Sequence, residues 1–258
     1  MAPASTPDID VIVPCYNYGR YLDECLRSLS AQTTPPAQVL VVDDGSTDED
    51  APLIPLIVER HGFRLIRQQN VGLVQTLRRG IAETFGESFV VVSADDRVAP
   101  SFLEKLALAL RAAPAAGYAY ARMEYFGDRS GSSTVRSFDA KTLVCAGNIV
   151  GAGALVRRSA YEATRGFRQL KALEDWDLWL SFLEKGYVGA FVDEPLYEWR
   201  QHGVSRSARA DMATRQGRRM RRAIQARHVR LMLRYYPSYA PIAARNFARR
   251  MRGADVEA

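Results

Sequence analysis

The sequence predicts an α/β protein built on an open, largely parallel sheet with helices on both faces. Within residues 1–112 of the 258-residue chain, four strand-like apolar segments alternate with four helix-like segments. This order requires parallel strands joined by right-handed crossovers. Paired acids, Asp43 with Asp44 and Asp95 with Asp96, follow two of the strand-like segments. Open α/β sheets bind their ligands at such strand ends.

The elements of this first half follow from the spacing of apolar residues. Strands are expected at residues 8–13, where Pro14 ends the strand, and at 38–42, 63–67 and 89–93. Helices are expected at 21–32, at 52–60, between Leu73 and Phe85, and after Pro100. The positions expected to face the core recur at helical spacing and are Leu22, Cys25, Leu26, Leu29, Leu73, Leu77, Ile81, Phe85, Phe102, Leu103, Leu106 and Leu110.

Beyond Pro114 the regular alternation ends. Strands are expected at residues 118–125, after the small-residue segment 151–156, and at 188–192, with an extended segment at 195–202. Residues 128–133 are expected to form a turn or a loop. A helix should begin at Glu174 and Asp175 and run to Leu183, and its dipole alone could account for the two acids. Residues 123–150 show no pattern that predicts a role.

Composition limits the class of protein. The chain is 47% hydrophobic, which is ample for a core. No run of 18 apolar residues occurs, so we expect no transmembrane helix, and residues 1–7 do not have the pattern of a signal peptide. The three cysteines are too widely spaced for a disulfide framework or a zinc site, which favours a cytoplasmic protein with reduced thiols.

Charge is unevenly distributed along the chain. Residues 206–252 carry 14 Arg and one Asp, a balance of +13, so a net charge of +6 leaves −7 for the rest. Residues 208–236 have a helical pattern with an apolar stripe of Met220, Ile224, Leu231 and Tyr235. This pattern favours a helix that packs on the body and exposes a basic face. An alternative is contact with an anionic membrane surface or a polyphosphate-linked acceptor. We expect no nucleic-acid partner, because no recognised module accompanies the arginines.

The acids at the strand ends allow two interpretations. Ser46, Thr47 and Asp48 can cap the following helix, which is ordinary structural chemistry. Capping does not explain why Asp43 and Asp44 come directly off the strand end. Asp95 and Asp96 would repel each other unless a cation lies beside them, and Mg²⁺ or Mn²⁺ commonly bridges a carboxylate to a phosphate. The sequence therefore predicts a divalent-metal site for a phosphate-bearing substrate, with a solvated capping loop as the alternative for this pair.

Together, four stretches resemble inverting glycosyltransferases of family 2, which have the GT-A fold. They occur in the family's order within residues 8–205, and any one of them alone is a weak signal. The stretches are VPCYN at 13–17 with AQT at 31–33, VVDDGSTD at 41–48, SADD at 93–96, and GF at 166–167 with EDWDLW at 174–179.

The resemblance implies a role for each matching residue. Asp175 matches the catalytic base, and Asp95 and Asp96 match the metal-binding acids. His202 matches a histidine near the metal and the diphosphate, although on its own it would be taken for an ordinary surface histidine. The remaining residues expected to contact the nucleotide-sugar are Pro14, Tyr16, Asn17, Asp43, Asp44, Asn70, Arg78 and Glu174.

The chain departs from the family pattern at two places. Ser93 stands where a common form of the motif has an acid, which leaves open whether Asp95 or Asp96 holds the metal. Family members often carry Arg-Asn where this chain has Leu77 and Arg78, so the donor contact from that helix would have to come from Arg78 or Arg79.

The resemblance also implies an organisation and a reaction. Residues 1–205 would form the GT-A domain, with a Rossmann-like nucleotide-sugar-binding half at 1–112 and an acceptor and catalytic half at 113–205. Residues 206–258 would be a basic helical extension. With Mg²⁺ or Mn²⁺ bound, the enzyme would move a sugar from a nucleoside-diphosphate sugar, preferably a UDP-sugar, to an acceptor hydroxyl. The acceptor would be a glycan, a lipid-linked sugar or a small molecule in cell-surface glycan, glycolipid or natural-product synthesis.

The protein would be cytoplasmic, and its basic tail could contact the inner face of the membrane.

Three other functions compete with sugar transfer. A sugar nucleotidyltransferase would need a Gly-rich, basic phosphate loop, which residues 14–19 lack. A nucleotide-sugar-binding protein that has lost catalysis would fit the departures at Ser93 and Leu77. A dinucleotide-binding enzyme is disfavoured, because no G-x-G-x-x-G follows the first strand.

Overall fold

The computed structural model of the chain describes residues 8–203 and 214–254, with side chains described as far as residue 241. The strands are β1 (Ile9–Cys15), β2 (Gln38–Asp43), β3 (Arg64–Arg67), β4 (Ser88–Val91), β5 (Arg97–Val98), β6 (Ala116–Gly127), β7 (Gly131–Ser132), β8 (Leu155–Arg157) and β9 (Val188–Gln201). The helices are α1 (Gly19–Ser30), the 3₁₀ helix η1 (Ala51–Leu53), α2 (Ile54–Arg60), α3 (Leu73–Ala82), α4 (Phe102–Ala112), α5 (Ala140–Cys145), α6 (Arg158–Glu162), α7 (Glu174–Glu184), α8 (Arg215–Arg227) and α9 (Val229–Ala254).

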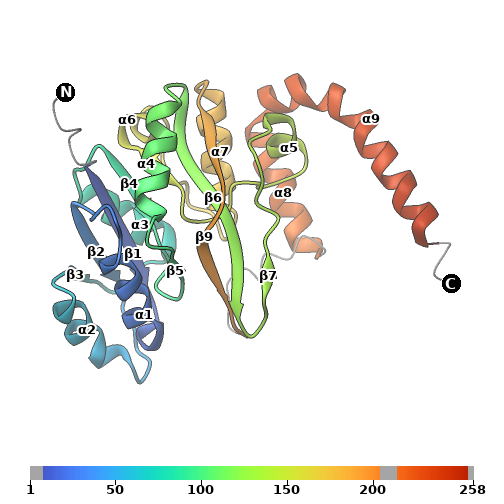
Figure 1. The fold of residues 1–258 in the computed structure, drawn as a ribbon. Coiled ribbons are helices and arrows are strands. Elements are labelled where there is room, and N and C mark those ends of the chain that lie inside the picture. The colour runs from blue at the N-terminus through green and yellow to red at the C-terminus, as the bar shows by residue number, and fades with distance from the viewer. Residues whose placement is uncertain (1–7, 204–213, 255–258) are drawn as a thin grey trace.

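The strands form one mixed sheet in the order β3-β2-β1-β4-β8-β6-β9-β5, with β7 beside β6 (Figure 1). β3, β2, β1 and β4 are mutually parallel, as the alternation of segments predicts. β8 is antiparallel to both β4 and β6, and it joins this half to the parallel pair β6 and β9. The predicted α/β class with an open mixed sheet is therefore confirmed.

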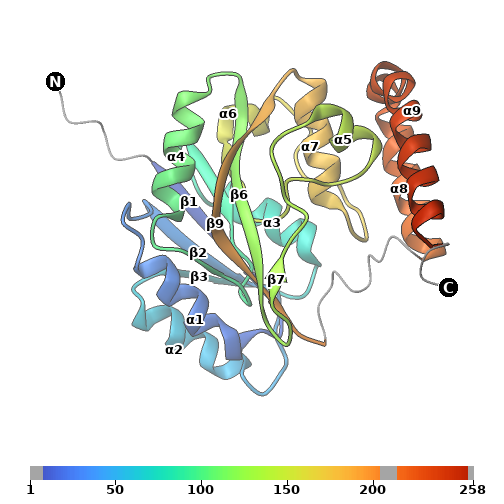
Figure 2. The same cartoon turned by 45° about the vertical axis from the view of Figure 1, so that its right-hand side comes forward.

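Helices cover both faces of the sheet (Figures 1 and 2). An apolar cluster fills the space between the sheet and the helices on each face. α1, α2 and α4 pack on one face, and α3, α5 and α7 pack on the other. The core positions predicted for the first and fourth helices are all buried. Phe85 is a wrong prediction, because α3 ends at Ala82 and the Phe85 side chain is 81% exposed.

Two local predictions were also wrong. Pro14 lies inside β1 and does not end it. Ile12 directs its carbonyl to the β4 side, and the alternation of the strand turns Pro14 the same way. Register pairing with β4 stops at Ile12 and Val91, so the missing N–H of Pro14 costs no sheet hydrogen bond. Neither η1 nor α2 has a side-chain cap, so the capping role expected of Ser46, Thr47 and Asp48 is not seen.

Elements absent from the sequence prediction are short or lie where the pattern was weak. They are β5, β7, α5 and α6. The two segments expected at 188–192 and 195–202 are one long strand, β9.

None of the described helices combines the length and the apolar run needed to cross a lipid bilayer.

The C-terminal helices pack on the body through the predicted stripe. Ile224 of α8 and Leu231 of α9 are buried in the cluster that contains α7, with Tyr235 partly buried against it. Met220 faces a small cavity shared with Leu170. Part of the helix expected from residue 208 and the predicted domain boundary at 205 fall in 204–213, outside the described residues, so that boundary stays a prediction.

A buried polar cluster anchors this extension to α7. Asp177 is fully buried and accepts two hydrogen bonds from the guanidinium of Arg168, at 2.5 and 2.7 Å. Nε2 of His228, at the junction of α8 and α9, lies 3.3 Å from the same carboxylate. Burial alone would raise the pKa of Asp177, but the hydrogen bonds from His228 and Arg168 outweigh it and hold the pKa below its usual value.

We predict that Asp177→Asn destabilises the fold by about 3–5 kcal/mol at neutral pH, because it leaves the partly buried Arg168 without its counter-charge. Urea unfolding would measure the loss. Asp177 titrates below its unfolded pKa of ~3.9, so its stabilisation is present above that pH and is lost as the pH falls through the folded value. The difference between wild type and variant should therefore shrink in acid. The exposed Asp128→Asn is the control, and an equal effect there would contradict the assignment.

Candidate functional site

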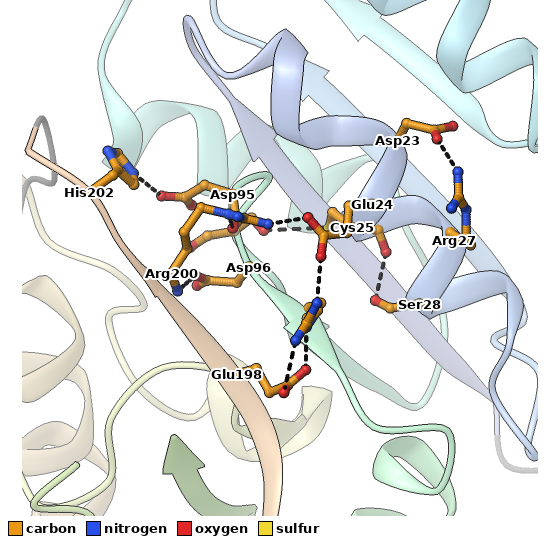
Figure 3. Close-up of polar contacts among 12 residues, drawn as sticks. Asp23, Glu24, Cys25, Arg27, Ser28, Asp95, Asp96, Glu198, Arg200 and His202 are labelled. Atoms are coloured by element: carbon orange, nitrogen blue, oxygen red, sulfur yellow. Dashed lines mark hydrogen bonds and ion pairs between the residues drawn. The ribbon is translucent and has the colours of Figure 1, made fainter. Parts of the chain in front are cut away.

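The predicted acid pair lies where the chain crosses the sheet (Figure 3). After β4 the chain leaves the middle of the sheet and enters β5, which pairs with β9 through Arg97 and Glu198. Asp96 is nearly buried and accepts from the hydroxyl of Tyr197 at 2.7 Å and from the backbone N–H of Arg200 at 2.8 Å. Both carboxylate oxygens of Asp96 are thus used to hold β9.

Asp95 is paired differently. Its Oδ2 lies 2.9 Å from Nε2 of His202, and both side chains are 9% exposed. The rings of Tyr18 and Tyr21 flank this imidazole, each with its centroid 5.4 Å away. Nδ1 of His202 is buried and has no hydrogen-bond partner among the described residues. The structure therefore joins the two predicted residues Asp95 and His202, 107 positions apart, in one partly enclosed pair.

The electrostatics of Asp95 and Asp96 favour a cation beside them. Burial raises the pKa of Asp96 well above its usual range, and the charge of Asp95 raises it further, against the hydrogen bonds from Tyr197 and Arg200. Burial, with the charge of Asp96, also raises the pKa of Tyr197 well above its usual value, so its hydroxyl stays a donor. A second negative charge beside Asp95 is therefore costly, and a divalent cation would relieve that cost.

An ion-pair network that the sequence did not reveal surrounds these acids (Figure 3). Nε of Arg200 donates to the backbone carbonyl of Asp95 at 2.8 Å, and its Nη2 pairs with Glu24 of α1. Arg97 pairs with Glu24 at 2.6 Å and with Glu198. Burial tends to raise the pKa of Glu24, but Arg97 and Arg200 hold it below its usual value. The network fixes α1, β5 and β9 around Asp95.

The acids after β2 organise the neighbouring loops. Asp43 is fully buried and accepts from the backbone N–H of Ser46 at 2.9 Å and from Arg67 at 3.0 Å. Asp44 accepts from the backbone N–H groups of Val71 and Gly72, each at 2.9 Å. These bonds hold the 68–72 loop ahead of α3, and the role of both acids toward base and ribose stays a prediction.

Asn17 joins two of the segments expected to bind the nucleotide. Its φ of 57° is unusual for a residue with a side chain. Its backbone N–H donates to Oγ of Ser46 at 2.9 Å, and its Oδ1 accepts from the backbone N–H of Thr47 at 2.8 Å. The Ser46 hydroxyl, one of the groups expected to cap the helix, thus bonds to the 14–19 loop instead. Tyr16 and Asn70 expose their side chains to solvent, where a ligand could contact them.

Asp175, the predicted base, lies half-buried in the first turn of α7. Its Oδ1 accepts from the backbone N–H of Trp176, and its Oδ2 accepts from Nδ2 of Asn148, both at 2.7 Å. Glu174 lies beside it, also half-buried. Sequence reasoning missed Asn148, because it lies in the 123–150 segment that showed no pattern.

The loop that carries Asn148 also reaches the acid site. Gly153 has a φ of 70°, and a Cβ there would lie 2.2 Å from a ring carbon of Tyr197. Tyr197 is the residue that donates to Asp96. Asp175 is therefore connected to the Asp95 and Asp96 pair through a short loop and one tyrosine.

α3 carries Leu77 and Arg78, where the chain departs from the family pattern. Leu77 is buried in the core, so its side chain is unavailable to a ligand. Nε of Arg78 donates to the backbone carbonyl of Phe167 at 2.8 Å, which ties α3 to the 166–167 segment. Arg79 donates to Gln68 at 3.0 Å. The predicted donor contact of Arg78 stays a prediction.

The fit of a metal differs between the two acids. Across residues 8–203 and 214–254, no group of three or more His, Cys, Asp or Glu side chains is placed to hold a metal ion. Asp95 and His202 offer one oxygen and one nitrogen ligand, whereas Asp96 is engaged by β9. Sites that bind Mg²⁺ through one or two carboxylates take their other ligands from substrate phosphates and water. Asp95 and His202 fit such a site better than Asp96 does.

Comparisons with known proteins agree with this architecture. Three bacterial relatives are 32–35% identical over 38–40% of this chain, and the matches span 30–33% of their own length. They are the glycosyltransferase GlyG of Streptococcus pneumoniae, the uncharacterized glycosyltransferase YibD of Escherichia coli and the putative glycosyltransferase EpsH of Bacillus subtilis. The putative glycosyltransferase EpsE of Bacillus subtilis is 28% identical over 207 residues, 76% of this chain and 74% of EpsE.

Two solved structures share the fold at low sequence identity. Staphylococcus aureus TarS residues 1–349, in complex with UDP-GlcNAc, matches with a TM-score of 0.69 and 18% identity over 90% of this chain and 72% of TarS. The mannosyltransferase PcManGT of Pyrobaculum calidifontis, in complex with GDP-Man and Mn²⁺, matches with a TM-score of 0.60 and 19% identity over 80% of this chain and 60% of PcManGT. The model of the family described as glycosyl transferase family 2 matches residues 10–169, more than half of the 258 residues. The chain therefore belongs to glycosyl transferase family 2.

Proposed function

We propose that this chain is an inverting glycosyltransferase that moves a sugar from a nucleoside-diphosphate sugar to an acceptor hydroxyl. The observation that carries the proposal is the connection of Asp175 to the acid pair through Asn148, Gly153 and Tyr197. A base and a diphosphate-binding site must act on the same anomeric carbon, and this connection holds the two at a fixed relation.

For the donor, we propose a UDP-sugar bound by the loops that carry Tyr16, Asn17, Asp43, Asp44 and Asn70. TarS was solved with UDP-GlcNAc and PcManGT with GDP-Man, so uracil and guanine nucleotides should both be tested. A thermal-shift screen of nucleoside diphosphates with and without Mn²⁺ tests the donor. We expect UDP with Mn²⁺ to give the largest shift, and no shift with any diphosphate would contradict the proposal.

We propose that Asp95 and His202 hold Mg²⁺ or Mn²⁺. The ion, when bound, neutralises charge that builds on the departing diphosphate. Asp96 and Arg200 contribute by holding the end of β9, which His202 directly follows.

For the chemical step, Asp175 takes the proton of the acceptor hydroxyl as the acceptor oxygen attacks the anomeric carbon. The bond to the diphosphate breaks, and the diphosphate leaves with the bonding electrons. Attack opposite the leaving group inverts the anomeric configuration. Asn148 and the backbone N–H of Trp176 orient the carboxylate.

We propose that the acceptor contacts the 123–150 segment, which contains α5 and supplies Asn148. Acceptor glycans, lipid-linked sugars and small molecules all suit the proposed reaction in cell-surface glycan, glycolipid or natural-product synthesis. For location we propose the cytoplasm, with contact between the basic C-terminal helices and the inner face of the membrane.

A second candidate function is nucleotide-sugar binding without catalysis. Ser93 in place of an acid and the burial of Leu77 favour it, because both remove groups that the family pattern supplies. Turnover separates the two candidates: release of nucleoside diphosphate from a donor in the presence of metal supports the enzyme, and binding without any release supports the second function.

We predict that Asp175→Asn lowers the transfer rate by about 10²–10⁴-fold, the usual contribution of a general base, and leaves the Kd for nucleoside diphosphate unchanged. Single-turnover transfer and calorimetric binding would measure the two effects. Asp193→Asn, at an exposed position of β9, is the matched control. Equal loss of transfer and of nucleotide binding would show that the role is misassigned.

The two neighbouring acids should respond differently to substitution. Asp95→Asn should abolish the part of nucleotide binding that depends on Mn²⁺. Asp96→Asn should keep that part and lower the stability by about 1–3 kcal/mol, because an amide whose oxygen accepts from the N–H of Arg200 leaves the Tyr197 hydroxyl without its carboxylate acceptor. Nucleotide titrations with Mn²⁺ or a chelator, together with thermal melts, distinguish the two. Loss of the Mn²⁺ effect in Asp96→Asn alone would reverse the assignment.

A further inference from the structure

The first two turns of α9 expose a stripe of large apolar side chains. Val229, Leu233 and Tyr236 are 52%, 73% and 53% exposed. Their spacing of four and three residues places them on one face of the helix. Single exposed apolar residues are common, but an aligned stripe marks a surface that binds something apolar.

A basic stripe runs beside the apolar one. Arg230 and Arg234 are exposed, and each follows a member of the apolar stripe by one residue, about 100° further around the helix. The remaining side of these turns carries Leu231 and Tyr235, which pack on the body. The start of α9 therefore has a buried face, an exposed apolar face and an exposed basic face.

The charge of this region has one sign. α8 and α9 together contain twelve Arg and no Asp or Glu. Where α8 meets α9, a cavity of about 450 Å³ is lined by four cations, Arg165, Arg168, Lys185 and Arg227, and by one carboxylate, Glu184. Arg168 is held by Asp177, and the other three cations have no ion-pair partner in the described part of the chain. With four cations against one carboxylate, the cavity carries the net positive charge of the helices onto the body.

We infer that this face of α8 and α9 docks on the surface of an anionic lipid bilayer. The apolar stripe of Val229, Leu233 and Tyr236 enters the boundary between headgroups and acyl chains, and the flanking arginines meet lipid phosphates. α9 lies at the outer edge of the molecule, where a bilayer has access to it (Figure 2). The inference refines the proposed location, rests on it, and does not require the sugar transfer.

An anionic bilayer fits the surface better than a second copy of the chain does. An amphipathic helix that lies in a bilayer surface needs apolar and cationic faces side by side, and this helix presents both. The same face of a second copy would bring Arg230 and Arg234 against like charges. Like charges placed together in this way oppose association.

Vesicle co-sedimentation of the full chain, without donor or acceptor, tests the inference. We expect binding to vesicles of equal parts phosphatidylcholine and phosphatidylglycerol, little binding to phosphatidylcholine alone, and weaker binding as salt rises. Leu233→Gln should weaken binding to the mixed vesicles about tenfold, because it removes one buried apolar side chain. Arg230→Gln combined with Arg234→Gln should remove most of the preference for phosphatidylglycerol.

Matched controls lie on other helices. Leu56→Gln on α2, where the side chain is 59% exposed, and Arg111→Gln on α4, also exposed, should leave vesicle binding unchanged. Equal binding to both vesicle types, or equal effects of Leu233→Gln and Leu56→Gln, would overturn the inference. Light scattering that shows a dimer without lipid, lost in Leu233→Gln, would also overturn it and identify the stripe as a contact between copies. Leu233→Gln should bind the nucleotide-sugar donor as the wild type does. Measuring donor binding in this variant therefore separates a failure of membrane docking from a failure of the proposed reaction.

Discussion

Two adjacent, nearly buried carboxylates, Asp95 and Asp96, set the central constraint of this structure. Charges of like sign are expensive in such a place unless each has its own partners. β9 and the residue that follows it supply them: Tyr197 and the backbone of Arg200 for Asp96, and His202 for Asp95. The crossing of the chain from β4 to β5, the pairing of β5 with β9, and the Glu24 network all serve this arrangement.

The other polar residues at the strand ends show how architecture and function can share the same side chains. Asp43, Asp44 and Asn17 hold three loops together by hydrogen bonds to backbone N–H groups. Loops fixed in this way present a preorganised surface, which lowers the entropy cost of binding a ligand. The exposed side chains of Tyr16 and Asn70 stand on loops made rigid by their buried neighbours.

α7 links the proposed catalytic base to the C-terminal helices. Its first turn carries Asp175, and two residues later Asp177 anchors the C-terminal helices through Arg168 and His228. The proposed membrane-facing helices are therefore fixed to the element that carries the proposed base. A substrate delivered at a lipid surface would meet a catalytic group whose position relative to that surface is set by one helix.

Local periodicity determined much of the fold, because it reports which side chains are buried. The parallel order of β1 to β4, the core face of α1 and the buried stripe through Ile224 and Leu231 could all be predicted in this way. Periodicity does not mark where a helix stops, so Phe85 was wrongly placed in the core. It also does not show how far along a strand each neighbouring strand pairs with it, so Pro14 was wrongly taken as a strand end. The motifs predicted roles for Asp95, Asp175 and His202, whereas the partners of these side chains depended on tertiary structure. Asn148, Tyr197 and Glu24 act across separations of 27, 101 and 176 residues, and only the closing of the sheet brings such distant positions within hydrogen-bond reach.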